Sequence, residues 1–145
     1  MKMTTEQYVE LEELAKEEEE FPYCDEDYWF VDSDTEVIER VWYGDDYDRG
    51  RASVGNVFKT KEQAEFTVEK LKVESELRKF SRPFEPTVDN YYIVFNTKTG
   101  YLGAGSRGYI TSQGVIYFES EEKVQQAIYS VGEERIKKYI FGVEE

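Results

Sequence analysis

Two groups of closely spaced carboxylates are the residues best suited to chemistry in this 145-residue sequence. They are Asp32, Asp34 and Glu36, which alternate, and Asp45, Asp46 and Asp48, which cluster around Tyr47. Either group offers the oxygen ligands that Ca²⁺ or Mg²⁺ prefers. Neither group has the central glycine and final glutamate of a calcium-binding loop. We therefore interpret them as a turn and a charged loop, and we expect no metal site.

A glycine-rich segment, Gly103 to Gly108, has the spacing of a dinucleotide-binding fingerprint. That motif must open a helix whose N-terminus holds the phosphate. Here Tyr109 to Thr111 look extended, and the next helix is predicted only after Ser120. We interpret the segment as a flexible hairpin loop, with a nucleotide or phosphate contact through Arg107 as the alternative.

The sequence gives little support for catalysis. It contains no histidine and a single cysteine, Cys24, so the usual zinc sites, an internal disulfide and the imidazole of a catalytic triad are excluded. No phosphate-binding P-loop or nucleophile elbow is present. We expect a protein that is not an enzyme, with no catalytic residues and no cofactor.

The net charge of −14 is concentrated at one end of the sequence. Residues 1–48 carry 18 acidic and three basic residues, whereas residues 49–145 carry 14 acidic and 15 basic residues. Such a block favours a positively charged partner and disfavours direct nucleic-acid binding, which needs a lysine and arginine surplus. No stretch approaches the ~20 apolar residues of a membrane span, and we expect a cytosolic protein with no membrane contact.

The first 20 residues are predicted to form an acidic N-terminal helix. Thr4 and Gln7 fit a capping box, and Tyr8, Leu11 and Leu14 share one face. Glu17, Glu18, Glu19 and Glu20 place like charges at the negative end of the helix dipole, so the last turn should fray unless a cationic surface meets it.

Residues 21–145 are predicted to form one α+β domain with two pseudo-repeats, at about 28–80 and 91–142. Each repeat reads as strand, strand, strand and helix, followed in the second by a short C-terminal helix over 133–141. Phe58 to Glu62 and Phe118 to Glu122 align at an offset of 60, and Thr60 and Ser120 are the expected helix caps. The first long helix carries apolar residues on two faces. We expect cover within the chain, with a homodimer through Phe66, Val73, Leu77 and Phe80 as the alternative.

Several segments resemble a known group of proteins. These segments are Trp42 to Arg49, Gly55 to Glu65, Lys70 to Lys72, Phe118 to Glu122 and Gly132 to Tyr139. Over roughly residues 28–142 the chain is similar to a family of small, mostly uncharacterised acidic proteins in phages and prophages of Firmicutes. The resemblance transfers no binding residue. It implies a context in which small acidic proteins inhibit host defence, among them anti-CRISPR proteins that occupy the nucleic-acid cleft of an effector nuclease.

We therefore predict a phage-derived inhibitor that acts in the bacterial host cytoplasm. It would contact a defence nuclease, in its most specific form a CRISPR effector, and would block its nucleic-acid site as a DNA mimic. The expected contact residues are Glu17, Glu18, Glu19, Glu20, Trp42, Tyr43, Asp45, Asp46, Tyr47 and Asp48. The alternatives are a protein that binds a nucleotide signal through Arg107, and a phage regulatory or scaffold dimer.

Overall fold

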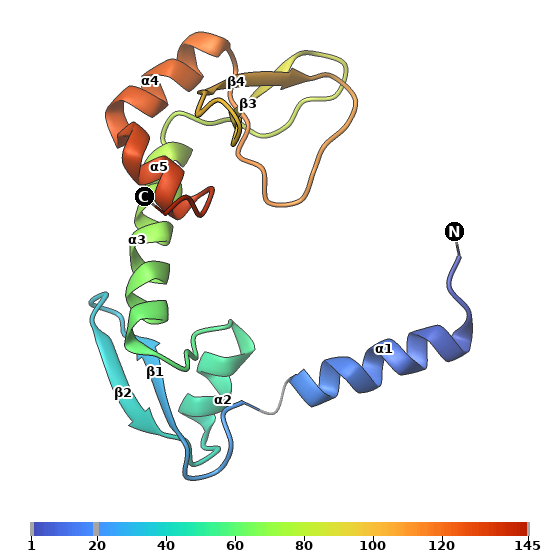
Figure 1. Cartoon of the computed structure of the whole chain (residues 1–145), viewed down its shortest axis with the longest axis vertical. Helices are drawn as coiled ribbons and strands as arrows, with labels where there is room; N and C mark the ends of the chain where they lie inside the picture. The colour runs from blue at the N-terminus through green and yellow to red at the C-terminus, as the bar shows by residue number, and fades with distance from the viewer. Residues whose placement is uncertain (1, 19–20, 145) are drawn as a thin grey trace. The chain divides into compact units, whose positions relative to one another are not determined.

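A computed structural model describes residues 2–18 and 21–144, and the side chains of its first helix as far as Leu14 (Figure 1). The described residues form five helices and two small antiparallel sheets of two strands each, which confirms the α+β prediction. The chain divides into two compact units, Met1–Glu65 and Phe66–Glu145. The boundary falls inside a helix, one turn after its start.

Unit 1 contains one helix, a β-hairpin, a short second helix and the first turn of a third. Their bounds are α1 Thr5–Glu18, β1 Asp27–Val31, β2 Val37–Val41, α2 Asp46–Ser53 and α3 Lys61–Arg78. In the hairpin Asp27 pairs with Val41, and Val31 pairs with Val37. The carboxylate of Asp32 forms the turn between the strands, because it accepts hydrogen bonds from the amides of Asp34 and Glu36, both at 2.9 Å.

The start of α1 has the predicted capping box. The amide of Thr4 donates to Gln7 Oε1 at 2.9 Å, and the amide of Gln7 donates to Thr4 Oγ1 at 3.2 Å. The side chains described for this helix, from Thr5 to Leu14, are all exposed. The capping of α1 is therefore local, and its apolar residues as far as Leu14 are not part of a core.

The third strand predicted for each repeat is wrong in extent. Instead of a strand near Val54 to Phe58, one isolated bridge joins Phe58 to Trp29 of β1, through two backbone hydrogen bonds of 2.8 and 2.9 Å. In unit 2 the bridge joins Phe118 to Tyr91, with bonds of 2.8 and 3.0 Å. A helix begins three residues after each bridge. Thr60 and Ser120, two residues after the bridges, cap the helices that follow, so little chain remains for a third strand.

Unit 2 contains a second hairpin and two further helices. Their bounds are β3 Asn90–Phe95, β4 Leu102–Arg107, α4 Glu121–Val131 and α5 Glu133–Tyr139. Ser120 caps α4 as predicted, since its hydroxyl accepts from the amide of Lys123 at 3.2 Å. In the hairpin Asn90 pairs with Arg107, and Phe95 pairs with Leu102.

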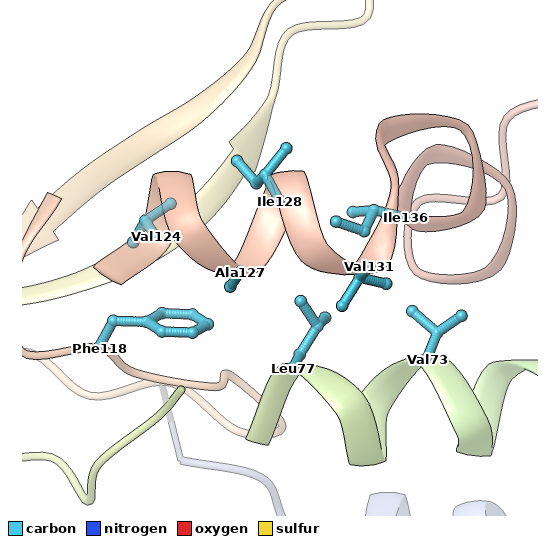
Figure 2. Packing of buried hydrophobic residues seen from close by; sticks show 8 residues of the cluster. All are labelled: Val73, Leu77, Phe118, Val124, Ala127, Ile128, Val131 and Ile136. Atoms are coloured by element: carbon cyan, nitrogen blue, oxygen red, sulfur yellow. The ribbon is translucent and has the colours of Figure 1, made fainter. Parts of the chain in front are cut away.

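The hydrophobic core of unit 2 lies between α3, α4 and α5 (Figure 2). Its buried members are Val73, Leu77, Phe118, Val124, Ala127, Ile128, Val131 and Ile136. Val73 and Leu77, which the sequence offered as a dimer face, are thus covered within the chain. Leu71 on the same helix is 54% exposed. α3 is buried on part of each face, as its apolar pattern indicated.

The interior of unit 1 is small and largely polar. Tyr28, Phe30 and Ala64 are buried, and the Arg51 guanidinium stacks on the Phe30 ring at 3.7 Å from its centroid. Asn56 fastens its segment to β1, because its side-chain amide donates to Val31 O at 2.7 Å and accepts from Val31 N at 2.8 Å. Polar contacts therefore carry much of the cohesion of this unit.

Candidate functional site

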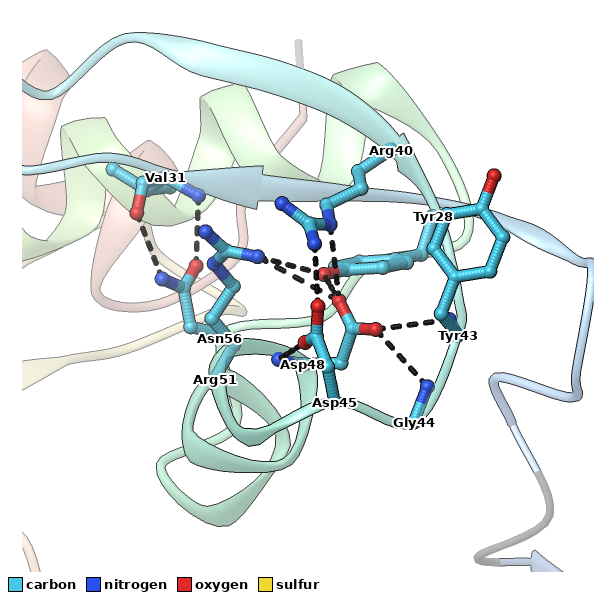
Figure 3. A network of polar contacts seen from close by, with 9 residues as sticks. All are labelled: Tyr28, Val31, Arg40, Tyr43, Gly44, Asp45, Asp48, Arg51 and Asn56. Carbon is cyan, nitrogen blue, oxygen red and sulfur yellow. Dashed lines mark hydrogen bonds and ion pairs between the residues drawn. The ribbon is translucent and has the colours of Figure 1, made fainter.

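A buried carboxylate organises the part of unit 1 in which the sequence placed its contact residues. Asp48 is fully buried, and its Oδ2 accepts from the amides of Tyr43 at 2.9 Å and Gly44 at 3.1 Å. Its Oδ1 accepts from the Tyr28 hydroxyl at 2.5 Å. Figure 3 shows the carboxylate between the Tyr28 ring and the turn at Tyr43 and Gly44. Asp48 thus ties α2 to β1 and to the end of the hairpin.

Two arginines balance the charge of this carboxylate. Arg40 Nε lies 3.3 Å from Asp48 Oδ1, and Arg40 Nη2 lies 2.7 Å from Asp45 Oδ2. Arg51 Nη1 lies 3.7 Å from Asp48 Oδ1 and donates to the Tyr28 hydroxyl at 3.0 Å. A buried carboxylate needs such partners, because an unpaired charge in the interior is very costly.

The network shifts the ionisation of its members in opposite directions. Burial raises the pKa of Asp48, but the hydrogen bonds from Tyr28 and the Tyr43 amide and the charge of Arg40 outweigh it, so the pKa falls below its usual value. Burial and the hydrogen bond to Asp48 raise the pKa of Tyr28 above its usual value. At neutral pH the pair therefore consists of a carboxylate and a neutral phenol.

The helix α2 was missed by the sequence interpretation, which treated this stretch as a charged loop. Asp45 is its N-cap, and its Oδ1 accepts from the amide of Asp48 at 2.8 Å. Acidic residues fill the first turn and Arg51 lies in the last, which is the pattern that suits the helix dipole. That charge pattern was the signal in the sequence that could have predicted this helix. Gly50 and the absence of an apolar face concealed it.

Exposed tyrosines and carboxylates lie on two neighbouring segments of unit 1, residues 23–27 and 43–47. The segment from Tyr23 to Asp27 lies along Trp42, since the Asp25 amide donates to Trp42 O at 3.0 Å and the Trp42 amide donates to Glu26 O at 2.9 Å. We define the acidic tyrosine surface as the exposed tyrosine and aspartate side chains of residues 23–27 and 43–47. They are Tyr23, Asp25, Asp27, Tyr43, Asp46 and Tyr47.

The sequence-predicted contact residues differ in how far they reach solvent. Tyr43 is 66% exposed and Tyr47 is 72% exposed. Trp42 is half-buried with its ring edge against Tyr28, at 5.8 Å between centroids. Asp46 is exposed and pairs with Arg49 at 2.9 Å, a surface ion pair of little energy.

Several of the acidic residues predicted to contact a partner are not exposed, and others lie outside the residues that the structure describes. Asp45 is half-buried and holds Arg40, whereas Asp48 is buried and has no access to a partner. The side chains of Glu17 and Glu18, and Glu19 and Glu20 as a whole, lie outside the described residues. Tyr43, Asp46 and Tyr47 are therefore the predicted residues that the structure places together at the surface.

The acidic character follows the division of the chain into units. Unit 1 has 20 acidic and seven basic residues, whereas unit 2 has 12 acidic and 11 basic residues. Of the seven cations in unit 1, Arg40 and Arg51 are engaged with Asp48. Unit 1 therefore presents a strongly negative surface, and unit 2 is close to neutral.

The glycine-rich segment is not the flexible loop that the sequence predicted. It forms strand β4, and Gly105 leaves room for the ring of Tyr92 on the paired strand. The Arg107 guanidinium donates to the Tyr92 hydroxyl at 3.2 Å and to Ser112 Oγ at 2.6 Å. These contacts hold Arg107 within unit 2, and the next helix after β4 is α4, which begins at Glu121.

The other carboxylate group, Asp32 to Glu36, is a turn, as interpreted from the sequence. Among residues 2–18 and 21–144, no three histidine, cysteine or acidic side chains gather as a metal site would require. In the same ranges no helix combines the length and the apolar character needed to cross a membrane.

Comparisons with protein-family models, with curated proteins and with solved structures find no match to this chain. The resemblance of several sequence segments to phage proteins therefore stays a prediction.

Proposed function

We propose that this protein inhibits a bacterial defence nuclease by covering a nucleic-acid-binding site, with unit 1 as the contact region. The observation that carries the proposal is the coincidence of strong negative charge and exposed tyrosine rings in unit 1. A nucleic-acid groove is lined by Lys and Arg for phosphates and by planar side chains for bases. A surface of carboxylates and phenol rings is complementary to both.

The two kinds of residue have different roles in this proposal. Asp25, Asp27 and Asp46 stand in for phosphates and speed the encounter through long-range attraction. Tyr43 and Tyr47 supply flat apolar area at little cost in conformational entropy, and their rings can stack on arginine guanidinium groups. Exposed tyrosines are typical anchors of such interfaces.

The buried network supports this surface without touching a partner. Asp48 holds the amides of Tyr43 and Gly44, so the backbone that carries Tyr43 is fixed before binding. A fixed backbone lowers the entropy that association costs. In the proposal Asp48 and Asp45 are thus positioning residues, and the contacts come from Tyr43, Asp46 and Tyr47 with the segment from Tyr23 to Asp27.

The choice of a defence nuclease as the partner rests on the resemblance to phage proteins. A phage-encoded inhibitor would act without catalysis, in the cytoplasm of the infected bacterium, as one copy bound to one effector. A CRISPR effector nuclease is the most specific form of the proposal, because its guide-RNA and DNA channels are long basic grooves.

The test is a competition experiment with purified CRISPR effectors loaded with guide RNA. Fluorescence anisotropy of labelled target DNA reports release as the inhibitor is added. We expect displacement at about 50 mM salt that weakens steeply towards about 500 mM, because screening reduces the attraction of exposed charges.

Matched variants separate the surface from the overall charge. One variant neutralises Asp25→Asn, Asp27→Asn and Asp46→Asn, and another changes Tyr43→Ala and Tyr47→Ala. The control neutralises three exposed acids of unit 2, Glu85→Gln, Asp89→Asn and Glu144→Gln. We expect both unit 1 variants to lose inhibition and the control to keep it. Equal loss of inhibition in the two unit 1 variants and the control would show that inhibition depends on net charge alone. Full inhibition by both unit 1 variants would refute the proposal.

A further inference from the structure

A cavity in unit 2 has the character of a small-molecule site and is independent of the proposed function. It has a volume of ≈ 170 Å³ and lies between α3, β3, the segment before Phe118 and the chain after α5. Its apolar lining consists of Leu77, Tyr92, Ile93, Val115, Ile116, Phe118, Ile140 and Phe141. All of these residues belong to unit 2.

The lining combines a rigid floor with accessible walls. Leu77 and Phe118 are buried members of the core, whereas Ile93, Ile116 and Phe141 are partly exposed and pack against that core. A ligand can therefore enter from solvent and rest on a fixed surface. Apolar cavities on the order of 150 Å³ lined by Leu, Ile and Phe bind benzene. The size and lining favour one aromatic ring.

One charged residue in the wall gives the cavity a chemical preference. The Glu74 side chain is 21% exposed and lines the cavity together with Leu77, one turn along α3. Its Oε2 accepts from Arg78 Nη2 at 3.4 Å, a long contact to a guanidinium that is itself 57% exposed. Among the described residues, the Glu74 carboxylate contacts Arg78 through Oε2. Its Oε1 can therefore accept a hydrogen bond from a ligand. A carboxylate beside aromatic rings favours a protonated amine.

We propose that this cavity binds a small aromatic amine, with the ring among Tyr92, Phe118 and Phe141 and the ammonium group at Glu74. The aromatic rings add attraction for the cation, and Glu74 supplies the opposite charge. A neutral ring of the same size binds more weakly, and an anionic one is rejected by the carboxylate.

The experiment uses three soluble probes that share one ring, namely benzylamine, benzyl alcohol and benzoate. Isoleucine methyl NMR spectra of the full chain report the binding, because Ile93, Ile116 and Ile140 line the cavity, whereas Ile38 and Ile110 are exposed and do not line it. We expect saturable shifts of the three lining methyls. Benzylamine should bind about fivefold more tightly than benzyl alcohol, as one partly exposed ion pair allows, and benzoate most weakly.

Two variants and a control make the outcome decisive. Glu74→Gln should reduce benzylamine to the affinity of benzyl alcohol. The control Glu65→Gln removes the acid of another i,i+4 pair on α3, with Lys61 at 3.8 Å, and should change nothing. Val115→Trp should fill the cavity and abolish all binding, while the methyls of Ile128 and Ile136 show that the core is intact. Absence of shifts at Ile93, Ile116 and Ile140, or equal affinity for the three probes, would overturn the proposal.

Discussion

The hydroxyl of Tyr28 donates a 2.5 Å hydrogen bond to Asp48, and this contact joins β1 to α2 at the centre of unit 1. The two residues lie 20 positions apart, and both are fully buried. Because the apolar interior of this unit is small, we expect the contact to contribute substantially to its stability.

Asp48→Asn should destabilise unit 1 by about 3 kcal/mol, because it leaves Arg40 and Arg51 without their buried counter-charge. Both tryptophans of the chain, Trp29 and Trp42, lie in unit 1, so urea unfolding followed by tryptophan fluorescence reports on this unit. Asp46→Asn, at an exposed position on the same helix, should cost less than about 0.5 kcal/mol. Similar losses in the two variants would show that the network contributes little.

The stability of unit 1 should fall in acid through Asp48. Its pKa in the folded protein lies below the ordinary value of 3.8. The contribution of the carboxylate is therefore complete above that ordinary value and is lost as the pH falls through the folded pKa. Tryptophan-monitored urea unfolding between pH 6 and pH 2 should show a loss below about pH 4 that is smaller in Asp48→Asn. Parallel curves for the two proteins would contradict this assignment.

Leu77→Ala should destabilise unit 2 by about 2–5 kcal/mol, because Leu77 is buried in the core beside Phe118 and Val131. Leu71→Ala provides the matched control on the same helix, since Leu71 is 54% exposed and should cost under about 1 kcal/mol. Hydrogen exchange of the α4 amides measures both effects. Equal effects of Leu77→Ala and Leu71→Ala would contradict the burial of Leu77 in the core.

Two glycines should respond to alanine in opposite directions. Gly50 lies inside α2 with open space around it, so Gly50→Ala should stabilise unit 1 by about 0.5–1 kcal/mol. In β4 a Cβ on Gly105 would lie 2.9 Å from the Tyr92 ring, so Gly105→Ala should destabilise unit 2 by about 1–3 kcal/mol. Tryptophan fluorescence follows the first change, and hydrogen exchange of β3 follows the second. A stabilising Gly105→Ala would show that the Tyr92 ring moves aside easily.

Local signals in the sequence predicted much of the secondary structure. The turn at Asp32, the strands around it and the caps at Thr4 and Ser120 depend on residues within about four positions of one another, and each is present. The helix α2 was missed because its stability comes from Asp45 as N-cap and from contacts of Asp48 with residues as distant as Tyr28. Strand β4 was missed because its glycines disfavour a strand locally, and its pairing with β3 compensates.

The candidate site was predictable in composition but not in orientation. Spacing placed Asp45, Asp46 and Asp48 in one group, yet the three point to an arginine, to solvent and to the interior, respectively. The helical period of α2 and the buried phenol of Tyr28 decide these directions, and neither was visible as a pattern. The cavity beside Glu74 forms from segments that the sequence keeps far apart, so no local motif indicated it.

The two hairpins have a consequence for the behaviour of the protein in solution. Within the described ranges, β2 and β4 each pair with another strand on one side, which leaves an open edge on the other. Open edges invite strand pairing between molecules, and mutual repulsion is one of the means by which proteins prevent it. At neutral pH the net charge of −14 supplies that repulsion. In mild acid, where the carboxylates lose their charge, the same edges become routes to aggregation.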